Sequence, residues 1–397
     1  MAGYIFLLDK DNPDSLRECI ELGIYSTKLS SPRKNIWSIP HEATFADYVT
    51  MRSGDNIYFF IDRKIYGIGT LIDMKWQDEQ GVEHHDCKFS NYPEANQPKQ
   101  FDYSDIKDKL LWDWGNGSAN NRWLCTYKPE PHFFRNGIDM DEVLSSNPSA
   151  FRMLRVIQNV TFIKFDDEEN QAFKDIILKS NRDYLKEPHN TDDMFEEKHE
   201  SAHALINSKL SINDYSLQIG PFLENSCDGE MIRHEMAIEA SLLYQISSKE
   251  DNAIDIFGNW DYLSHQVVAS PFKPVAYMDK MDFFGYTFIP NHQPTKASYL
   301  VGEIKKDKAI IENIEQVMKY VDWVKDEYCH NDYSMIFAYL IAYEFSKEVI
   351  EYKKQNAKRI YSIGRRPSKT KEWSEAFKLV SYKFDSSSGR LKFHVVG

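Results

Sequence analysis

The stretch YLVGEIKKDKAIIENIEQVMKY, residues 299–320, decides the fold of the second half of the chain. Its first part is apolar, as in a buried strand, and its second part has the apolar spacing of a helix. Glu303 and Lys305 are two residues apart in the strand, so their side chains point to the same face. Burying an acid and a base together costs free energy unless the two groups pair or hold something else. We therefore expect a functional site at this strand.

The segments around this stretch predict a small α/β unit, closed by a hairpin near residues 386–390. The expected elements are a helix at 231–246, strands at 264–272, 276–289 and 298–306, a helix at 311–328, a strand at 334–343 and a helix at 346–355. Polar side chains line up in four elements of this series: the helix at 231–246, the strands at 276–289 and 298–306, and the helix at 311–328.

The order of these polar residues resembles the PD-(D/E)xK nuclease superfamily, particularly its RecB-like branch. There, an acid on one strand, an ExK motif on the next strand and a QxxxY motif on the following helix build one site. A Glu of the preceding helix often joins them. MDFFG at 281–285 resembles the acid strand, GEIK at 302–305 the ExK strand and QVMKY at 316–320 the QxxxY helix. The resemblance covers roughly residues 230–345 and implies a restriction-endonuclease-like α/β core.

The resemblance also implies a phosphodiester hydrolase whose catalytic residues are Asp282, Glu303, Lys305, Gln316 and Tyr320. Carboxylate and carbonyl oxygens are the ligands that Mg²⁺ prefers, and this ion activates water and stabilises charge on a phosphate. Lys305 would orient the water or neutralise the phosphate, and partial burial would let its amine lose a proton more readily. Gln316 and Tyr320 share one helix face and would orient the phosphate or the lysine.

The expected ligands of Mg²⁺, with Mn²⁺ as an alternative ion, are Glu235, Asp282, Glu303 and the backbone carbonyl of Ile304. Two choices stay open, because Glu239 follows Glu235 by one helical turn and Asp279 precedes Asp282 on the other strand face. We favour Asp282, since DFFG is the closer match to the acid strand. The alternative interpretation is an ion pair at an exposed strand edge, with Tyr320 in the core.

A basic segment follows this unit. Residues 352–371, YKKQNAKRIYSIGRRPSKTK, contain eight Lys or Arg and no acid, although the whole chain has a net charge of -13. Such a segment is suited to gripping phosphates, and the alternative is a solvated helix end and loop. The residues expected to contact nucleic acid here are Lys358, Arg359, Arg365, Arg366 and Lys369.

The first half is rich in aromatic residues and short strands. Residues 56–76, NIYFFIDRKIYGIGTLIDMKW, predict a hairpin that turns near Asp62 and Arg63. Together with the preceding RSGD, this pattern resembles PUA-like β-barrels of the EVE type, which read nucleic acids and sometimes hold a modified base between aromatic rings. Trp37 and Trp76 are the expected base-stacking residues, with the tryptophans at 112, 114 and 123 as further candidates. The alternative is that these rings pack in the core of the domain.

Length and composition limit the remaining choices. For 397 residues we expect more than one domain: a PUA/EVE-like recognition domain at 1–182, a linker at 183–205 and a nuclease domain at 206–397. The negative net charge excludes a uniformly basic surface, so nucleic acid must bind to a local patch. The five cysteines form no CxxC pair, and no long apolar segment occurs. We expect an α+β multidomain protein of the cytoplasm with no membrane partner.

The motif series resembles Shedu-type antiphage nucleases most, and also NucS-type nucleases. This resemblance implies a Mg²⁺-dependent DNA endonuclease in prokaryotic antiviral defence, which assembles as a homo-oligomer, a dimer or tetramer. One alternative is a modification-dependent restriction enzyme whose first domain reads a modified base. The other is a non-catalytic scaffold that binds nucleic acid.

Overall fold

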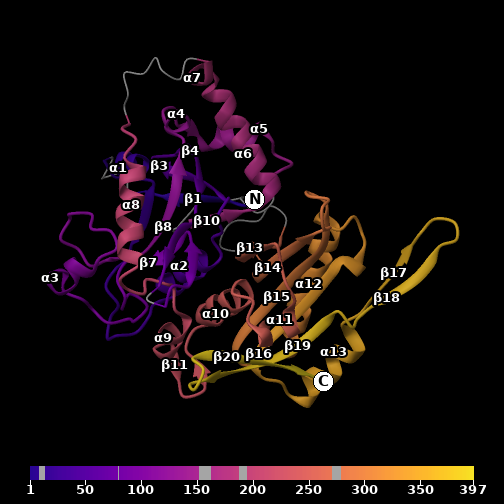
Figure 1. Cartoon of the computed structure of the whole chain (residues 1–397). Helices are drawn as coiled ribbons and strands as arrows, with labels where there is room; N and C mark the ends of the chain where they lie inside the picture. Colours follow the sequence, from indigo (N-terminus) through magenta and orange to yellow (C-terminus); the bar gives the residue numbers. More distant parts are fainter. Residues whose placement is uncertain (9–13, 79, 152–161, 187–194, 271–278) are drawn as a thin grey trace. The chain divides into compact units, whose positions relative to one another are not determined.

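The computed structural model describes residues 1–397 except 9–13, 79, 152–161, 187–194 and 271–278 (Figure 1). The chain divides into two compact units, Met1–Gln218 and Ile219–Gly397, here called unit 1 and unit 2. Helix α8 (His199–Leu210), half of which falls in the expected linker, belongs to unit 1, so the expected boundaries at 182 and 206 differ from this division. Residues 187–194 of that linker lie outside the described residues. In the described part, no helix is long and apolar enough to cross a membrane.

Unit 1 is built on an eight-stranded sheet with the order β10-β1-β3-β4-β8-β2, to which β7 and β9 add at β8 and β4. These strands are β1 (Gly3–Leu7), β2 (Ile24–Lys28), β3 (Asn56–Ile61), β4 (Lys64–Leu71), β7 (Lys88–Ser90), β8 (Asn121–Pro129), β9 (Ile138–Asp139) and β10 (Phe162–Phe165). The longer helices are α1 (Asp14–Leu22), α2 (Ile39–Val49), α6 (Asp167–Ser180) and α8. Strands β5 (Met74–Gln77) and β6 (Glu83–Asp86) form a separate hairpin.

The predicted hairpin at 56–76 is confirmed as β3 and β4. Asp62 and Arg63 occupy its turn with φ angles of 47° and 64°, which matches the left-handed backbone of the tight turns that suit twisted strands. The sheet also rolls up. The ring centroid of Tyr25 on β2 lies 4.3 Å from that of Phe6 on β1, with the rings stacked, and 5.7 Å from that of Phe162 on β10. These contacts bring β2 and β10 together, although the two strands stand at opposite ends of the strand order.

Unit 2 contains a six-stranded sheet with the order β13-β14-β15-β16-β19-β20. Its strands are β13 (Tyr262–Val268), β14 (Lys280–Phe288), β15 (Lys296–Lys308), β16 (Ile336–Glu344), β19 (Phe377–Asp385) and β20 (Arg390–Val396). Its helices include α9 (Ile219–Glu224), α10 (Glu235–Ser247), α11 (Asp251–Phe257), α12 (Ile311–Glu327) and α13 (Lys347–Asn356). Strands β15, β16 and β19 are parallel, and α12 makes the crossover from β15 to β16 (Figure 1).

Unit 2 agrees with most of the predicted element order, and the mixed α and β class is confirmed. The closing hairpin is β19–β20, and the helix expected from 231 begins only at Glu235, after a short strand β12 (Met231–Ile232). The predicted strand at 264–272 is β13, which ends before the undescribed residues 271–278. No strand was predicted in the basic segment, and the structure forms two there, β17 (Arg359–Ile363) and β18 (Lys369–Trp373).

Strand β15 lies between β14 and β16 in the strand order, so the ExK motif belongs to an interior strand of the sheet. Gly302, just before the motif, pairs with Phe283 of β14. A Cβ atom on Gly302 would lie 1.9 Å from the Phe283 ring, which is fully buried. The glycine therefore leaves the space that this ring fills.

We expect Gly302→Ala to lower the free energy of unfolding by about 1–3 kcal/mol, because the ring must leave its position. Chemical denaturation measures this loss. Adding Phe283→Leu should recover part of it, so that the double variant is more stable than the sum of the single effects predicts. Strict additivity would contradict the assigned contact.

Candidate active site

Unit 2 brings the predicted catalytic residues and the candidate helix ligands together from four elements. Asp282 lies on β14, Glu303 and Lys305 lie on β15, and Gln316 and Tyr320 lie on α12. Both glutamates considered as helix ligands lie on α10. The expected order of acid strand, ExK strand and QxxxY helix is therefore present in space as well as in sequence.

Asp282 is positioned by a break in the sheet. The ladder between β14 and β15 ends at Phe283 and Gly302. Beyond that point, the Oδ2 atom of Asp282 accepts the backbone N–H of Ile304 at 2.7 Å. The side chain thus replaces a ladder bond and is fixed against β15. The alternative residue, Asp279, is exposed and precedes β14.

Glu303 and Lys305 form an ion pair. The Nζ atom of Lys305 donates to Oε1 of Glu303 at 2.6 Å, and only 2% of the Glu303 side chain is exposed. The interpretation as a pair at an exposed strand edge therefore fails, because the strand is internal and the acid is buried. Oε2 of Glu235 lies 3.8 Å from the same amine, and its Oε1 accepts the backbone N–H of Lys306 at 3.3 Å.

Glu239, rather than Glu235, is the helix residue linked to Asp282. It is 2% exposed, and Gln266 of β13 connects the two carboxylates. The Nε2 atom of Gln266 donates to both oxygens of Glu239 at 3.0 and 3.1 Å and to Oδ1 of Asp282 at 3.1 Å. Gln266 is a residue of this site that the sequence motifs did not indicate.

The QxxxY pair forms a short hydrogen-bonded chain. Nε2 of Gln316 donates to the Tyr320 hydroxyl at 2.6 Å, and this hydroxyl donates to the carbonyl of Lys280 at 2.7 Å. Tyr320 is 1% exposed, so it also contributes to the core. The chain ties α12 to the start of β14, just before Asp282.

The carboxylates of this site strongly affect one another. Burial, together with the charges of Glu239 and Glu303, raises the pKa of Asp282 well above its usual range. Burial also raises the pKa of Glu303, although Lys305 acts in the opposite direction. Burial alone would lower the pKa of Lys305, but Glu303, Asp282 and Glu235 outweigh it and raise that pKa. The expectation that this amine loses its proton readily is therefore wrong for the site as it stands.

The site fits a divalent cation by the chemistry of its donors. The Oε2 atom of Glu303 is buried and no donor meets hydrogen-bond geometry with it, although the nearby Tyr320 hydroxyl lowers the pKa of this carboxyl. A buried oxygen ordinarily has a partner. Nitrogen donors of Gln266 and Lys305 stand among the carboxylates, and no three His, Cys, Asp or Glu of the described chain form a ready metal cage. The unpaired Oε2 and the raised pKa values are both features that a bound cation would relieve.

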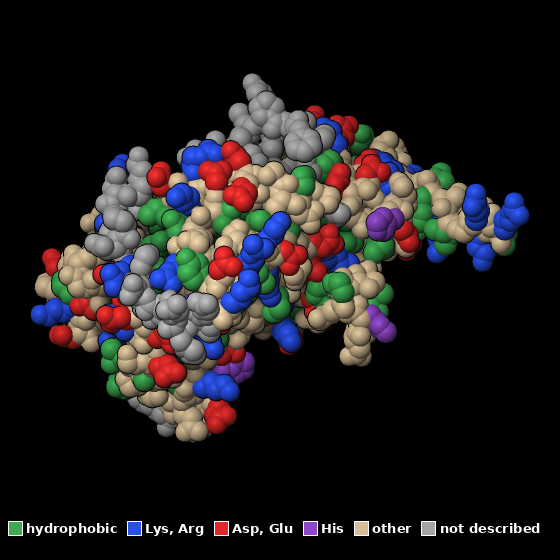
Figure 2. Space-filling model, turned by 90° about the horizontal axis from the view of Figure 1, so that it is seen from above, with side chains coloured by type: hydrophobic (Ala, Val, Ile, Leu, Met, Phe, Trp, Pro, Cys, Tyr) green, Lys and Arg blue, Asp and Glu red, His purple; other side chains and the backbone are tan. Residues whose placement is uncertain are grey.

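The basic segment forms a two-stranded ribbon, β17–β18, which projects from unit 2 (Figure 1). Figure 2 shows Lys and Arg side chains gathered at its free end, where Arg365, Arg366 and Lys369 are exposed. Arg359 has another role, because its guanidinium binds Asp322 of α12 at 2.9 and 2.7 Å. Lys358 is exposed just before β17. The free end of the ribbon, here called the ribbon tip, is therefore cationic, whereas the opposite end is anchored to α12 by Arg359.

The two tryptophans expected to stack on bases, both in unit 1, differ in how far their rings are exposed. Trp37 is 1% exposed and packs against Trp123 and Arg122, which leaves no ring face for a base and corrects the expectation for this residue. Trp76 is partly exposed on the β5–β6 hairpin, where His84 stacks on it at 5.6 Å. The rings at 112 and 114 line a cavity of about 250 Å³, together with Glu18, Glu21, Leu22, Asp113 and Lys198. Its three acids would repel a phosphate.

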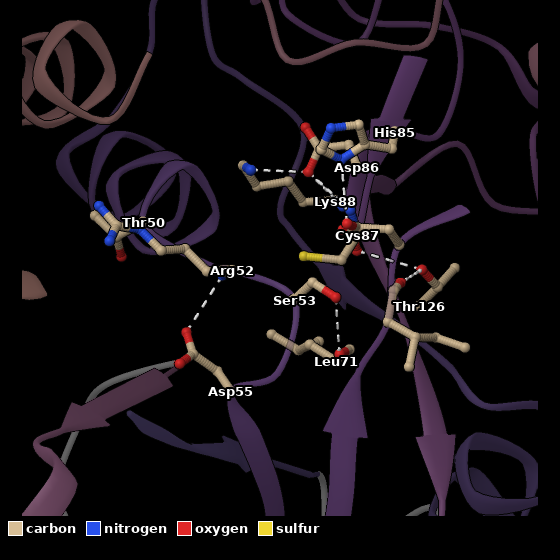
Figure 3. Close-up of polar contacts among 12 residues, drawn as sticks. Thr50, Arg52, Ser53, Asp55, Leu71, His85, Asp86, Cys87, Lys88 and Thr126 are labelled. Atoms are coloured by element: carbon tan, nitrogen blue, oxygen red, sulfur yellow. Dashed lines mark hydrogen bonds and ion pairs between the residues drawn. The ribbon is translucent and has the colours of Figure 1, made fainter. Parts of the chain in front are cut away.

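A polar cluster of unit 1, drawn in Figure 3, is occupied by structural contacts. Asp55 accepts the backbone N–H groups of Ala2 at 2.8 Å and of Arg52 at 3.3 Å. The Nζ atom of Lys88 donates to Asp86 at 2.8 Å. These contacts fix the turn before β3 and the start of β7, and they satisfy the charged groups locally.

Comparisons with protein-family models and with curated proteins found no match. Among solved structures, the chain is similar to a repair endonuclease from Pyrococcus abyssi, with 17% identity and a TM-score of 0.21. The similarity covers 34% of this chain and 47% of that chain, so it spans about half of the neighbour's length.

Proposed function

We propose that unit 2 is a divalent-metal-dependent nuclease that hydrolyses phosphodiester bonds in DNA. The observation that supports this most is the group of Glu239, Asp282 and Glu303, which are held together with raised pKa values for two of them and one buried oxygen without a partner. This arrangement costs free energy without a ligand, and a bound cation would offset that cost. Lys305 supplies the positive charge that a phosphate needs.

The proposal gives each side chain a role. Asp282 and Glu303, with Glu239 or Glu235, would hold Mg²⁺ or Mn²⁺, and the carbonyl of Ile304 stays a predicted ligand. Such an ion activates water and stabilises charge on phosphorus. Lys305 stays protonated beside Glu303 and would contact a phosphate oxygen, rather than act as a base. Tyr320 and Gln316 would hold the acid strand in place through Lys280.

The ribbon tip is the proposed DNA contact. Residues 359–371 include Arg365, Arg366, Lys369 and Lys371 with no acid, and a two-stranded ribbon is narrow enough to enter the major groove of duplex DNA. Recognition by unit 1, assembly as a dimer or tetramer, and a role in antiphage defence rest on the family resemblance alone. A non-catalytic scaffold would have no use for the buried carboxylates.

Asp282→Asn tests the metal site. We expect it to abolish binding of Mg²⁺ or Mn²⁺ in calorimetry and to abolish DNA cleavage, while the fold persists because the amide oxygen still accepts the Ile304 N–H. Asp279→Asn makes the same charge change outside the site and should leave both unchanged. Unaltered metal affinity in a folded Asp282→Asn protein would refute the assignment.

Lys305→Met separates catalysis from stability. We expect cleavage to be lost and the free energy of unfolding to fall by about 1–3 kcal/mol, less than the 3–5 kcal/mol of a fully buried pair, because 26% of the side chain is exposed. Adding Glu303→Gln should restore stability but not activity. The matched control is Lys306→Met, which should keep activity. If Lys305→Met cleaves DNA as the wild type does, the lysine is structural.

The ribbon tip is tested by charge reversal. We expect Arg365→Glu with Arg366→Glu to weaken DNA binding on every sequence and to flatten the dependence of log affinity on log salt by about two units. Metal binding should not change. Lys249→Glu with Lys347→Glu, two exposed lysines outside the basic segment, makes the same charge change elsewhere on unit 2. Equal effects of the two pairs would mean that only net charge matters and that the tip has no special contact.

A further inference from the structure

Gln266 has an unusual backbone for a strand residue. Its φ angle is 53°, in the left-handed region that residues other than glycine rarely adopt. The pairing of β13 with β14 runs from Tyr262 to His265 and resumes at Val267, so Gln266 is the one position skipped. By this register it stands opposite Asp282. Backbone conformations of this kind persist when the surroundings enforce them, and they cluster at functional sites.

The contacts of Gln266 differ from those of a structural glutamine in the same unit. Gln245 is buried and bonds the backbone of Leu391 through both ends of its amide, at 3.0 and 3.1 Å. Among the residues that the structure describes, the amide nitrogen of Gln266 bonds carboxylate oxygens alone, those of Glu239 and Asp282. Gln266 therefore links the two carboxylates to each other, whereas Gln245 binds the backbone.

An amide NH₂ between two carboxylates stands in for a cation. It places partial positive charge at the point where the negative charges of Glu239 and Asp282 meet. The Nδ1 atom of His265 lies 3.6 Å from Oε2 of Glu239, and the amine of Lys305 is bonded to the neighbouring Glu303. A half-turn about the last bond of the Gln266 side chain exchanges its nitrogen and oxygen. The same position then presents an oxygen, which a hard cation prefers.

We propose that Gln266 is a two-state positioning residue of the metal site. Without metal, its nitrogen holds Glu239 and Asp282 together. With metal, its amide turns and its oxygen Oε1 faces the ion that these acids share. The strained backbone fixes the amide within reach of both states. This inference rests on the proposed function, because it requires a divalent cation at Asp282.

The test uses Gln266→Met and Gln266→Lys in the full-length chain, with two readouts that do not depend on activity. Calorimetry with Mn²⁺ measures affinity, and thermal unfolding in chelator measures the metal-free state. Met has a similar length but no hydrogen-bonding group. We expect it to lower Mn²⁺ affinity by about 10–100-fold and to lower the melting temperature in chelator, because the two acids lose their bridge.

Lys places a permanent cation between the acids. We expect Gln266→Lys to raise the melting temperature in chelator and to abolish Mn²⁺ binding. This variant keeps the proposal falsifiable if the Met variant does not fold, because a Lys variant no more stable than the wild type would overturn it. Mn²⁺ affinity of the folded Met variant equal to that of the wild type would also overturn it.

The outcomes separate this inference from the proposed function. If the wild type itself binds no Mn²⁺ or Mg²⁺, the proposed metal site fails and the inference fails with it. If the wild type binds the ion and Asp282→Asn does not, but Gln266→Met binds it as the wild type does, only the role of Gln266 is wrong.

Discussion

The hydrogen bond from the Ile304 backbone to Asp282 is the interaction on which the site depends. At this point β14 and β15 stop pairing, and a side chain takes over a bond that the backbone would otherwise make. The acid is thereby fixed on the same side of the sheet as Glu303. Because β15 is internal, Glu303 is buried, and Asp282 beside it on β14 is half-buried, so water solvates neither acid fully. The perturbed pKa values follow from that placement.

The helices complete this arrangement from separate parts of the chain. Helix α10 brings Glu239 toward Asp282, and α12 brings Tyr320 to the start of β14. Each helix also buries an apolar side in unit 2, so the site is positioned by the packing that stabilises the core. The side chains of Lys305 and Glu235 are 26% and 40% exposed, so both combine a place in the site with access to solvent.

Sequence patterns predicted the site's order well, for physical reasons. The ExK strand and QxxxY helix are local features, and the hairpin at Asp62 and Arg63 depends on its turn residues, so short-range periodicity was enough. Gln266 was missed because its role depends on a left-handed φ and on partners in other elements, which no spacing reveals. The prediction for Trp37 was wrong because the sequence pattern of an aromatic residue in the core is the same as that of one on a binding surface. The anchoring of Arg359 required knowledge of Asp322, 37 residues away.

The bidentate ion pair between Arg359 and Asp322 also has a mechanical consequence. A guanidinium held by both oxygens of a carboxylate resists rotation as well as separation, and the Trp373 indole donates to the Ile336 carbonyl at the same end of the ribbon. The ribbon is thus attached through Arg359 to α12, the helix that carries Tyr320. A load applied to its tip is borne by that helix, and through it by the strand that begins at Lys280.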